Sequence, residues 1–184
     1  MQLRQERDAE AAETLETGSH LRVVACCARE RPANSARGNA MTDDPFNLER
    51  FVAAQASTFD QALEELREGH KRGHWMWFIF PQMRGLGRSG IAQAYGIASR
   101  AEAGAYRAHP ILGDRLVSAT QAVLRHEDTT ARAIFGTPDE MKFRSSMTLF
   151  AAVDQDGPFR ATLVAFYEGT EDAATLKMLD IVHR

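Results

Sequence analysis

The sequence predicts an all-α fold: a compact single-domain bundle of about seven or eight short helices around a buried central helix. Three observations support this prediction. Helix start and stop signals recur at close intervals, apolar residues between them follow helical spacing, and no segment alternates apolar and polar residues over a useful length. With 184 residues, of which 44% are hydrophobic and 26% charged, the chain is long enough to bury a substantial core.

The first forty residues differ in composition from the rest of the chain. Residues 1–40 contain no aromatic residue, and their apolar stretch is short. A segment with so little to bury cannot offset the entropy that it would lose on ordering. We therefore expect a disordered extension over 1–40 and a helical domain over 41–184. The domain opens with a helix-start pattern in which Asp44 is the cap and Pro45 lies in the first turn.

Helix signals then recur along the domain. Ser57, Ser99 and Thr137 each stand three residues before an acidic residue, as in a capping box, and Pro158 begins a further helix. Glycine or proline ends most of these segments. The expected helices lie within residues 57–69, 99–110, 110–126, 137–154, 157–169 and 171–182.

Two segments are apolar on all sides. Residues 75–80 (WMWFIF) are predicted to form a buried helix that ends at Pro81, because a lone strand would leave its backbone groups unpaired. Residues 147–153 (MTLFAAV) lack a polar face, which places their helix at the centre of the fold.

The bulk properties of the chain exclude several function classes. The net charge of −3 is too small to imply affinity for nucleic acid or a membrane surface, and no apolar run approaches the roughly 18–20 residues of a membrane span. The two cysteines, Cys26 and Cys27, are adjacent, which rules out a disulfide framework and fits the reducing cytoplasm. We expect no nucleic-acid partner, no membrane partner, no metal site and no cofactor.

Residues 85–90 have the glycine spacing of a dinucleotide-binding fingerprint. No β-rich strands flank them, so we do not expect a Rossmann fold. The same residues can instead form a small anion site, in which Arg84 and Arg88 supply charge and Ser89 caps a following helix. The alternative is a solvated loop whose arginine stems cover apolar surface.

Four polar residues precede the apolar half of the central helix, namely Lys142, Arg144, Ser145 and Ser146. At about 100° per residue they spread around most of the helix, so at least one should face inward. We consider them candidates for lining a ligand cavity. In the alternative interpretation, Arg144 pairs with a carboxylate and only locks helices together. Its candidate partners are Asp154, Asp172 and Asp180.

Three residues in and beside the aromatic segment complete the candidate site. His74 is a weak catalytic candidate as a general base, Trp77 can stack against a flat ring, and Gln82 can hydrogen-bond a ligand. Each also has a structural alternative, as a helix cap, a core residue or a loop cap respectively.

Several segments, DPFNLERFVAAQ, HWMWFIFPQMRGLGRS, EAGAYRAHPILGDRL and KFRSSMTLF, resemble the domain-of-unknown-function 1810 family of small bacterial proteins. The resemblance covers about residues 44–180. It implies a mainly helical fold and carries over no catalytic residue. Proteins of this family often bear the label calpastatin. Calpastatin is a long, disordered and repetitive protease inhibitor, so we do not expect this compact, non-repetitive chain to act as one.

The sequence therefore supports two hypotheses. In the first, a cytoplasmic protein binds a small anionic or nucleotide-like ligand in a pocket between residues 74–90 and the start of the helix over 138–153. In the second, the chain is a non-enzymatic protein-interaction module whose aromatic segment contacts a partner. An exposed face over residues 75–80 would favour the second hypothesis.

Overall fold

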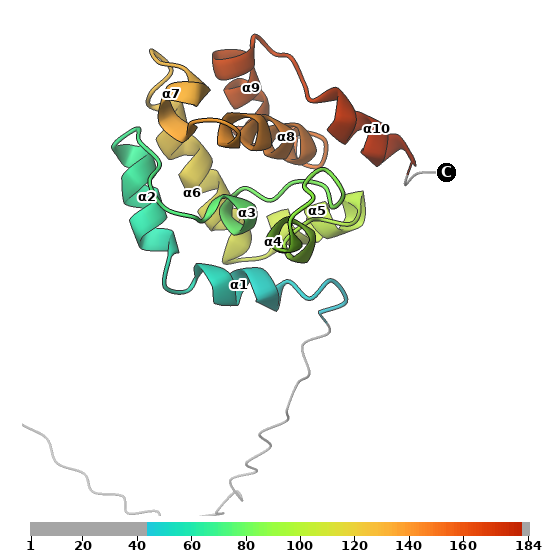
Figure 1. Cartoon of the computed structure of the whole chain (residues 1–184). Helices are drawn as coiled ribbons and strands as arrows, with labels where there is room; N and C mark the ends of the chain where they lie inside the picture. Colours follow the sequence, from blue (N-terminus) through green and yellow to red (C-terminus); the bar gives the residue numbers. More distant parts are fainter. Residues whose placement is uncertain (1–43, 182–184) are drawn as a thin grey trace, which may run out of the picture. The chain divides into compact units, whose positions relative to one another are not determined.

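The computed structural model describes residues 44–181, and this part of the chain is all-α, which confirms the predicted fold class (Figure 1). It holds ten helices, seven of which have seven or more residues. The other three have four or five residues, too few for a recognisable amphipathic period. The bounds are α1 Glu49–Gln55, α2 Phe59–Arg67, α3 Met76–Ile79, α4 Gly90–Ala94, α5 Arg100–Ala108, α6 Leu112–Leu124, α7 Ala131–Phe135, α8 Asp139–Ala151, α9 Phe159–Tyr167 and α10 Ala173–Ile181. The extension predicted over 1–40 lies outside the described residues.

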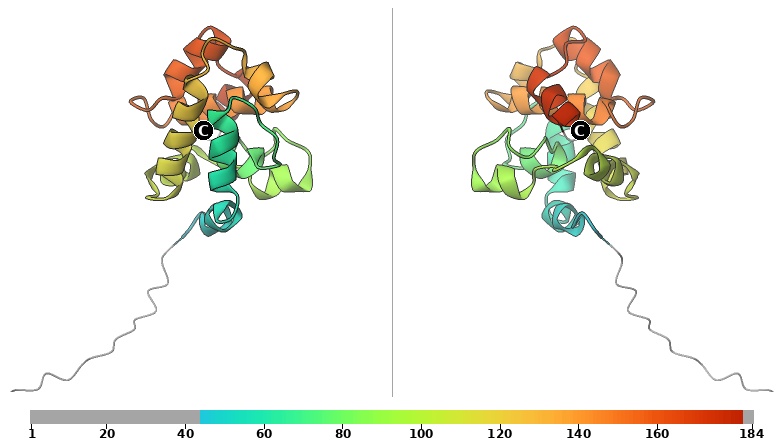
Figure 2. Two further views of the ribbon diagram at one scale, coloured as in Figure 1. Left: turned by 90° about the vertical axis from the view of Figure 1, so that its left-hand side faces the viewer. Right: turned by 90° about the vertical axis from the view of Figure 1, so that its right-hand side faces the viewer.

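Helix α8 is the predicted buried central helix. It contacts α3, α5, α7, α9 and α10, and Figure 1 shows it running through the middle of the domain. The side chains of Phe143, Met147, Leu149 and Phe150 are fully buried. Figure 2 shows α9 and α1 at opposite ends of the domain, with α8 between them. Residues on the first turns of α8 therefore lie where several elements converge.

Aromatic side chains connect α8 to its neighbours. Phe143 lies against Phe80, with ring centroids 4.8 Å apart, and stacks on Phe135 of α7 at 4.5 Å. Tyr106 of α5 bridges Phe150 of α8 and Phe51 of α1, at 5.4 and 4.9 Å. Burying one such ring contributes roughly 1.5–3 kcal/mol. The segment over 75–80 is thus a structural part of the core, and its helix α3 is a single turn that ends two residues before Pro81.

The caps expected from the sequence are partly confirmed. Ser99 and Ser89 accept hydrogen bonds from the backbone N–H groups of Glu102 (3.1 Å) and Ala92 (3.2 Å). The capping roles predicted for Ser57 and Thr137 are wrong. Helix α2 has Thr58 and not Ser57 at its N-cap position, and no side chain caps it; the Thr58 amide donates to the Gln55 carbonyl at the end of α1. Thr137 instead donates its hydroxyl proton to the Glu140 carboxylate at 3.0 Å.

The first helix begins later than expected. Asp44 does act as a cap, because its carboxylate accepts the N–H groups of Leu48 (2.8 Å) and Glu49 (3.0 Å). The helix itself starts at Glu49, however, since Asn47 adopts a left-handed conformation with φ of 52° that interrupts a helix from Pro45.

Residues 82–98 form a loop that encloses the short helix α4. Two backbone hydrogen bonds close its base, from Arg84 N to Ile97 O at 2.8 Å and from Ile97 N to Gln82 O at 2.9 Å. The described residues contain this isolated bridge but no β-strand, which agrees with the rejection of a Rossmann fold. None of the helices between residues 44 and 181 has the length and apolar character that a membrane crossing requires.

Candidate functional site

A pocket of about 270 Å³ lies between the 82–87 end of this loop and the first turns of α8. It brings together three of the ten residues singled out in the sequence, Gln82, Lys142 and Ser145. Its remaining walls come from the loop, from α8 and from the start of α10, and they consist of Leu86, Gly87, Pro138, Met141, Asp172 and Ala174. The lining therefore includes a glutamine, a lysine, a serine and an aspartate beside apolar side chains.

The loop wall of the pocket requires glycine at position 87. A Cβ atom on Gly87 would lie 2.5 Å from the Cβ of Ala92 and 3.2 Å from Nε2 of Gln82. The turn therefore packs directly on α4 and brings the Gln82 amide to the pocket. Within the described part of the chain the Gln82 side chain makes no hydrogen bond, so its amide is available to a ligand.

Lys142 is held at the pocket by a charged cluster. Its ammonium group donates to Oδ1 of Asp139 at 2.7 Å and lies 5.0 Å from the centre of the Trp77 ring. Lys71 contacts Oδ2 of the same carboxylate at 2.7 Å and lies over Trp75 at 5.2 Å. Two lysines thus share one carboxylate, which leaves the cluster one positive charge. Burial raises the pKa of Asp139, but the hydrogen bonds from both lysines outweigh it, so the pKa is lowered and the carboxyl stays ionised.

Asp172 forms the opposite wall and is fixed by hydrogen bonds. Its Oδ2 accepts from the amide of Thr175 at 2.9 Å, from the Thr175 hydroxyl at 2.5 Å and from the Ser145 hydroxyl at 3.2 Å. Its own N–H donates to Thr148 at 2.9 Å. Asp172 therefore caps α10 and ties it to α8. Its place in the pocket was not predicted from the sequence, which suggested Asp172 only as a partner of Arg144. The Asp-x-x-Thr spacing was the available cap signal.

Arg144 does not line this pocket. Its Nε and Nη2 groups donate to the carbonyls of Thr170 (2.9 Å) and Glu171 (2.8 Å), and the guanidinium lies 5.8 Å from the Tyr167 ring centre. The predicted pairing with an aspartate is therefore wrong, since backbone carbonyls just before α10 satisfy the arginine. Asp154 pairs with Arg107 instead, at 2.6 Å.

The other candidate residues lie outside the pocket lining. His74 and Arg88 are exposed, and Trp77 is half-buried beneath Lys142. The Ser89 hydroxyl is occupied as the cap of α4. Ser146 is fully buried, and its hydroxyl has no hydrogen-bond partner among the described residues. These five candidate residues therefore do not line the pocket.

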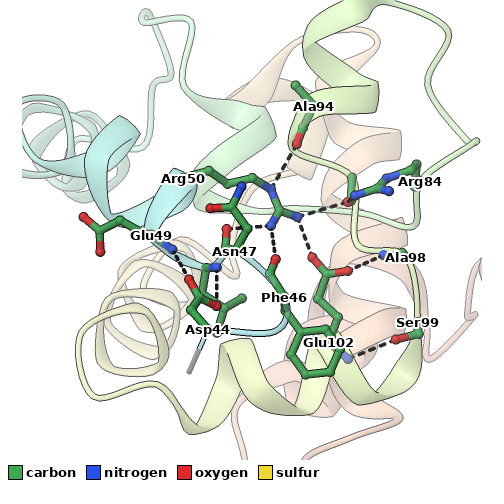
Figure 3. Close-up of polar contacts among 12 residues, drawn as sticks. Asp44, Phe46, Asn47, Glu49, Arg50, Arg84, Ala94, Ala98, Ser99 and Glu102 are labelled. Atoms are coloured by element: carbon green, nitrogen blue, oxygen red, sulfur yellow. Dashed lines mark hydrogen bonds and ion pairs between the residues drawn. The ribbon is translucent and has the colours of Figure 1, made fainter. Parts of the chain in front are cut away.

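Arg84 lines a separate, more open groove beside Arg50 (Figure 3). The Arg50 guanidinium is saturated, because it donates to four backbone carbonyls, including that of Ala94 at 3.0 Å, and pairs with the buried Glu102 at 2.5 Å. Arg84 is exposed and donates to the Gly96 carbonyl at 3.2 Å. Arg50 therefore anchors α1 to the 94–98 segment and to α5, and it has no donor left for a ligand.

A buried carboxylate missed by the sequence analysis anchors the loop before α3. Glu65 of α2 is 1% exposed, and its Oε2 accepts from the amides of Arg72 and Gly73 and from the indole N–H of Trp75, each at 2.8 Å. Burial raises the pKa of Glu65, but these hydrogen bonds outweigh it and lower the pKa. Glu65 thereby fixes the loop that carries Lys71 and leads to Trp77.

No group of three or more metal-ligating side chains gathers anywhere in residues 44–181. The residues that line the pocket include one cation, one anion, an amide and a hydroxyl. These groups can bind and orient a small polar molecule.

Comparisons with known proteins found a matching family and a similar solved structure. The family model described as protein of unknown function DUF1810 matches residues 45–179. The crystal structure of the conserved hypothetical protein Rv1873 from Mycobacterium tuberculosis is similar, with 50% sequence identity and a TM-score of 0.73, over 74% of this chain and 99% of that chain. A comparison with curated proteins found no match. The family match spans most of the chain and every helix that lines the pocket, so the chain belongs to the DUF1810 family.

Proposed function

We propose that this protein binds a small anionic or nucleotide-like molecule in the pocket between residues 82–87 and the start of α8. The observation that supports the proposal most strongly is the position of Lys142. Lys142 lines the pocket, and Asp139 and Trp77 hold its ammonium group in place, so the charge has a fixed position before a ligand arrives.

The size of the pocket limits the ligand. Its volume of about 270 Å³ lies just below the roughly 300–1,000 Å³ that is usual for drug-sized ligands. A single ring or a short phosphorylated chain fits such a space, whereas a whole dinucleotide does not. Leu86, Pro138 and Met141 provide apolar contact, and Gln82 provides both a donor and an acceptor.

The interaction-module hypothesis finds less support in the structure. It depends on an exposed aromatic face over residues 75–80, but Trp75, Phe78 and Phe80 are buried and Trp77 is half-buried under a lysine. The large apolar side chains that are exposed within residues 44–181 are scattered and do not extend this segment: Ile91, Met141 and Val164 lie on α4, α8 and α9, and Ile111 lies just before α6.

A thermal-shift screen against nucleotides and phosphorylated metabolites tests the proposal. A ligand at one hundred times its Kd should stabilise the domain by about 2.7 kcal/mol, or roughly 8 °C for a domain of this size. Lys142→Met should abolish the shift. The variant should still fold, because Asp139 keeps Lys71 as its partner.

The matched control is Lys177→Met, which removes the same charge from an exposed position on α10 outside the pocket. It should preserve the ligand-induced shift. A ligand that stabilises wild type and Lys142→Met equally would show that binding occurs elsewhere, and a complete screen without a Lys142-dependent ligand would contradict the proposal.

A further inference from the structure

The walls of the pocket present opposite charges. Lys142 lines the α8 side and Asp172 lines the α10 side. A pocket built for a polyanion gains nothing from a carboxylate, because each added negative charge repels the ligand. Asp139 already offsets part of the lysine charge, since it bonds to both Lys142 and Lys71. The pocket therefore provides weak attraction for a multiply charged phosphate.

One oxygen of Asp172 is available to a ligand. Its Oδ2 accepts three hydrogen bonds, which account for the cap of α10 and the link to Ser145. Its Oδ1 accepts none from any residue between 44 and 181. A carboxylate oxygen can accept about two hydrogen bonds, so Oδ1 remains a strong acceptor on a residue that lines the pocket. Its natural partner is an N–H or O–H group of a bound molecule.

We infer that Asp172 determines the specificity of the pocket, and that the ligand carries both an anionic group for Lys142 and an adjacent amino or other donor group for Asp172. This inference rests on the proposed function and narrows it to small molecules that carry both an anionic group and an amino group, such as amino acids and amino-alkyl phosphates. Gln82 can bond to either end of such a molecule, and the Ser145 oxygen can accept a hydrogen bond from the donor group. A fully charged nucleoside triphosphate does not satisfy the pocket.

Two matched pairs of probes test the inference: glycine against acetate, and phosphoethanolamine against ethyl phosphate. Each pair differs by the amino group. Binding is followed by NMR shifts of the Gly87 and Ala174 amides, both at pocket residues. Wild type should prefer the aminated member about tenfold, the factor that corresponds to about 1.4 kcal/mol.

Asp172→Asn separates the charge of Asp172 from its structural role. Asparagine is as good an N-cap as aspartate, so α10 should keep its start. The variant should lose the preference for the aminated probe and bind the other member at least as well as wild type does. Asp180→Asn removes the same charge from an exposed site on α10. It should change neither the preference for the aminated probe nor the binding of the other probe.

Three results would overturn the inference. The first is equal binding of both members of each pair to wild type, and the second is a preference that survives in Asp172→Asn. In either case, loss of binding in Lys142→Met would leave the proposed function intact. The third is failure of all four probes, in which case the broader nucleotide and metabolite screen still decides the proposed function separately.

Discussion

Replacing the buried Glu65 by glutamine tests how strongly a single carboxylate organises the approach to the pocket. Three N–H groups converge on its Oε2, from Arg72, Gly73 and Trp75. Glutamine can still offer one oxygen to these three donors, but its NH2 group replaces the Oε1 that accepts from Nε2 of Gln61 at 3.2 Å. The hydrogen bonds become neutral, however, and each should weaken by about 1 kcal/mol.

The net loss in the free energy of unfolding should be smaller than the sum of the losses at the three hydrogen bonds. Glutamine is cheaper to bury than an ionised carboxylate, which offsets part of the loss. We expect Glu65→Gln to lower the free energy of unfolding by about 2 kcal/mol, measured by urea denaturation. Glu65→Ala, which leaves three buried donors unpaired, should cost about 4 kcal/mol or more.

The neighbouring Glu64 provides a matched control. Its side chain is 61% exposed and pairs with Arg67, whose side chain is 50% exposed. Glu64→Gln should change the stability by less than about 0.5 kcal/mol. If Glu65→Gln were as stable as Glu64→Gln, the carboxylate would not organise the loop and our interpretation would be refuted.

The stability of wild type and of Glu65→Gln should respond differently to pH, in a direction that the pKa of Glu65 determines. The pKa of Glu65 is lowered in the folded state, so its contribution to stability is present above the unfolded value of about 4.3 and is lost as the pH falls through the folded value. Wild type should therefore lose stability more steeply than Glu65→Gln below about pH 5. Asp139 also has a lowered pKa, but it is present in both proteins and cancels from the comparison.

The remaining predictions concern packing and buried polar groups, and urea denaturation checks each one. Arg50→Met leaves the 3%-exposed Glu102 unpaired and should cost about 3 kcal/mol or more, with partial recovery in the double variant with Glu102→Gln. Ser146→Ala removes a fully buried hydroxyl without a partner and should stabilise the domain by about 1 kcal/mol; a loss instead would indicate a hidden partner. Gly104→Ala should stabilise α5 by about 1 kcal/mol because a Cβ meets open space, whereas Gly113→Ala should destabilise α6 because its Cβ would overlap the Arg107 carbonyl. Equal effects of the two glycine variants would contradict this packing.

The fold could be predicted from the sequence because its signals are local. The apolar run over 147–153 requires a buried helix, and caps such as Ser99 mark helix starts without reference to the rest of the chain. The boundaries failed where the local geometry differs from the standard cap. Thr137 bonds to the Glu140 carboxylate and caps no backbone N–H group, and the left-handed Asn47 delays α1.

The candidate site was predictable only in part. Gln82, Lys142 and Ser145 come together as expected, because the aromatic segment and the central helix must pack against each other. The place of Asp172 depends on how α10 returns to α8, which spacing alone does not specify. Arg144 illustrates the same limit, because its carbonyl partners lie 26 and 27 residues away along the chain. Every residue type has a backbone carbonyl, so the sequence does not reveal such a partner.

The most direct test of ligand binding at the pocket uses the indole N–H signals in an NMR titration with the best ligand from the screen. The chain has two tryptophans, and they report on different surroundings. Trp77 lies under the Lys142 ammonium, whereas Trp75 is buried and bonded to Glu65. We predict that the Trp77 signal moves with ligand concentration, that the Trp75 signal does not, and that Lys142→Met abolishes the change. A titration in which the Trp77 signal stays fixed while the ligand demonstrably binds would contradict our account of the pocket.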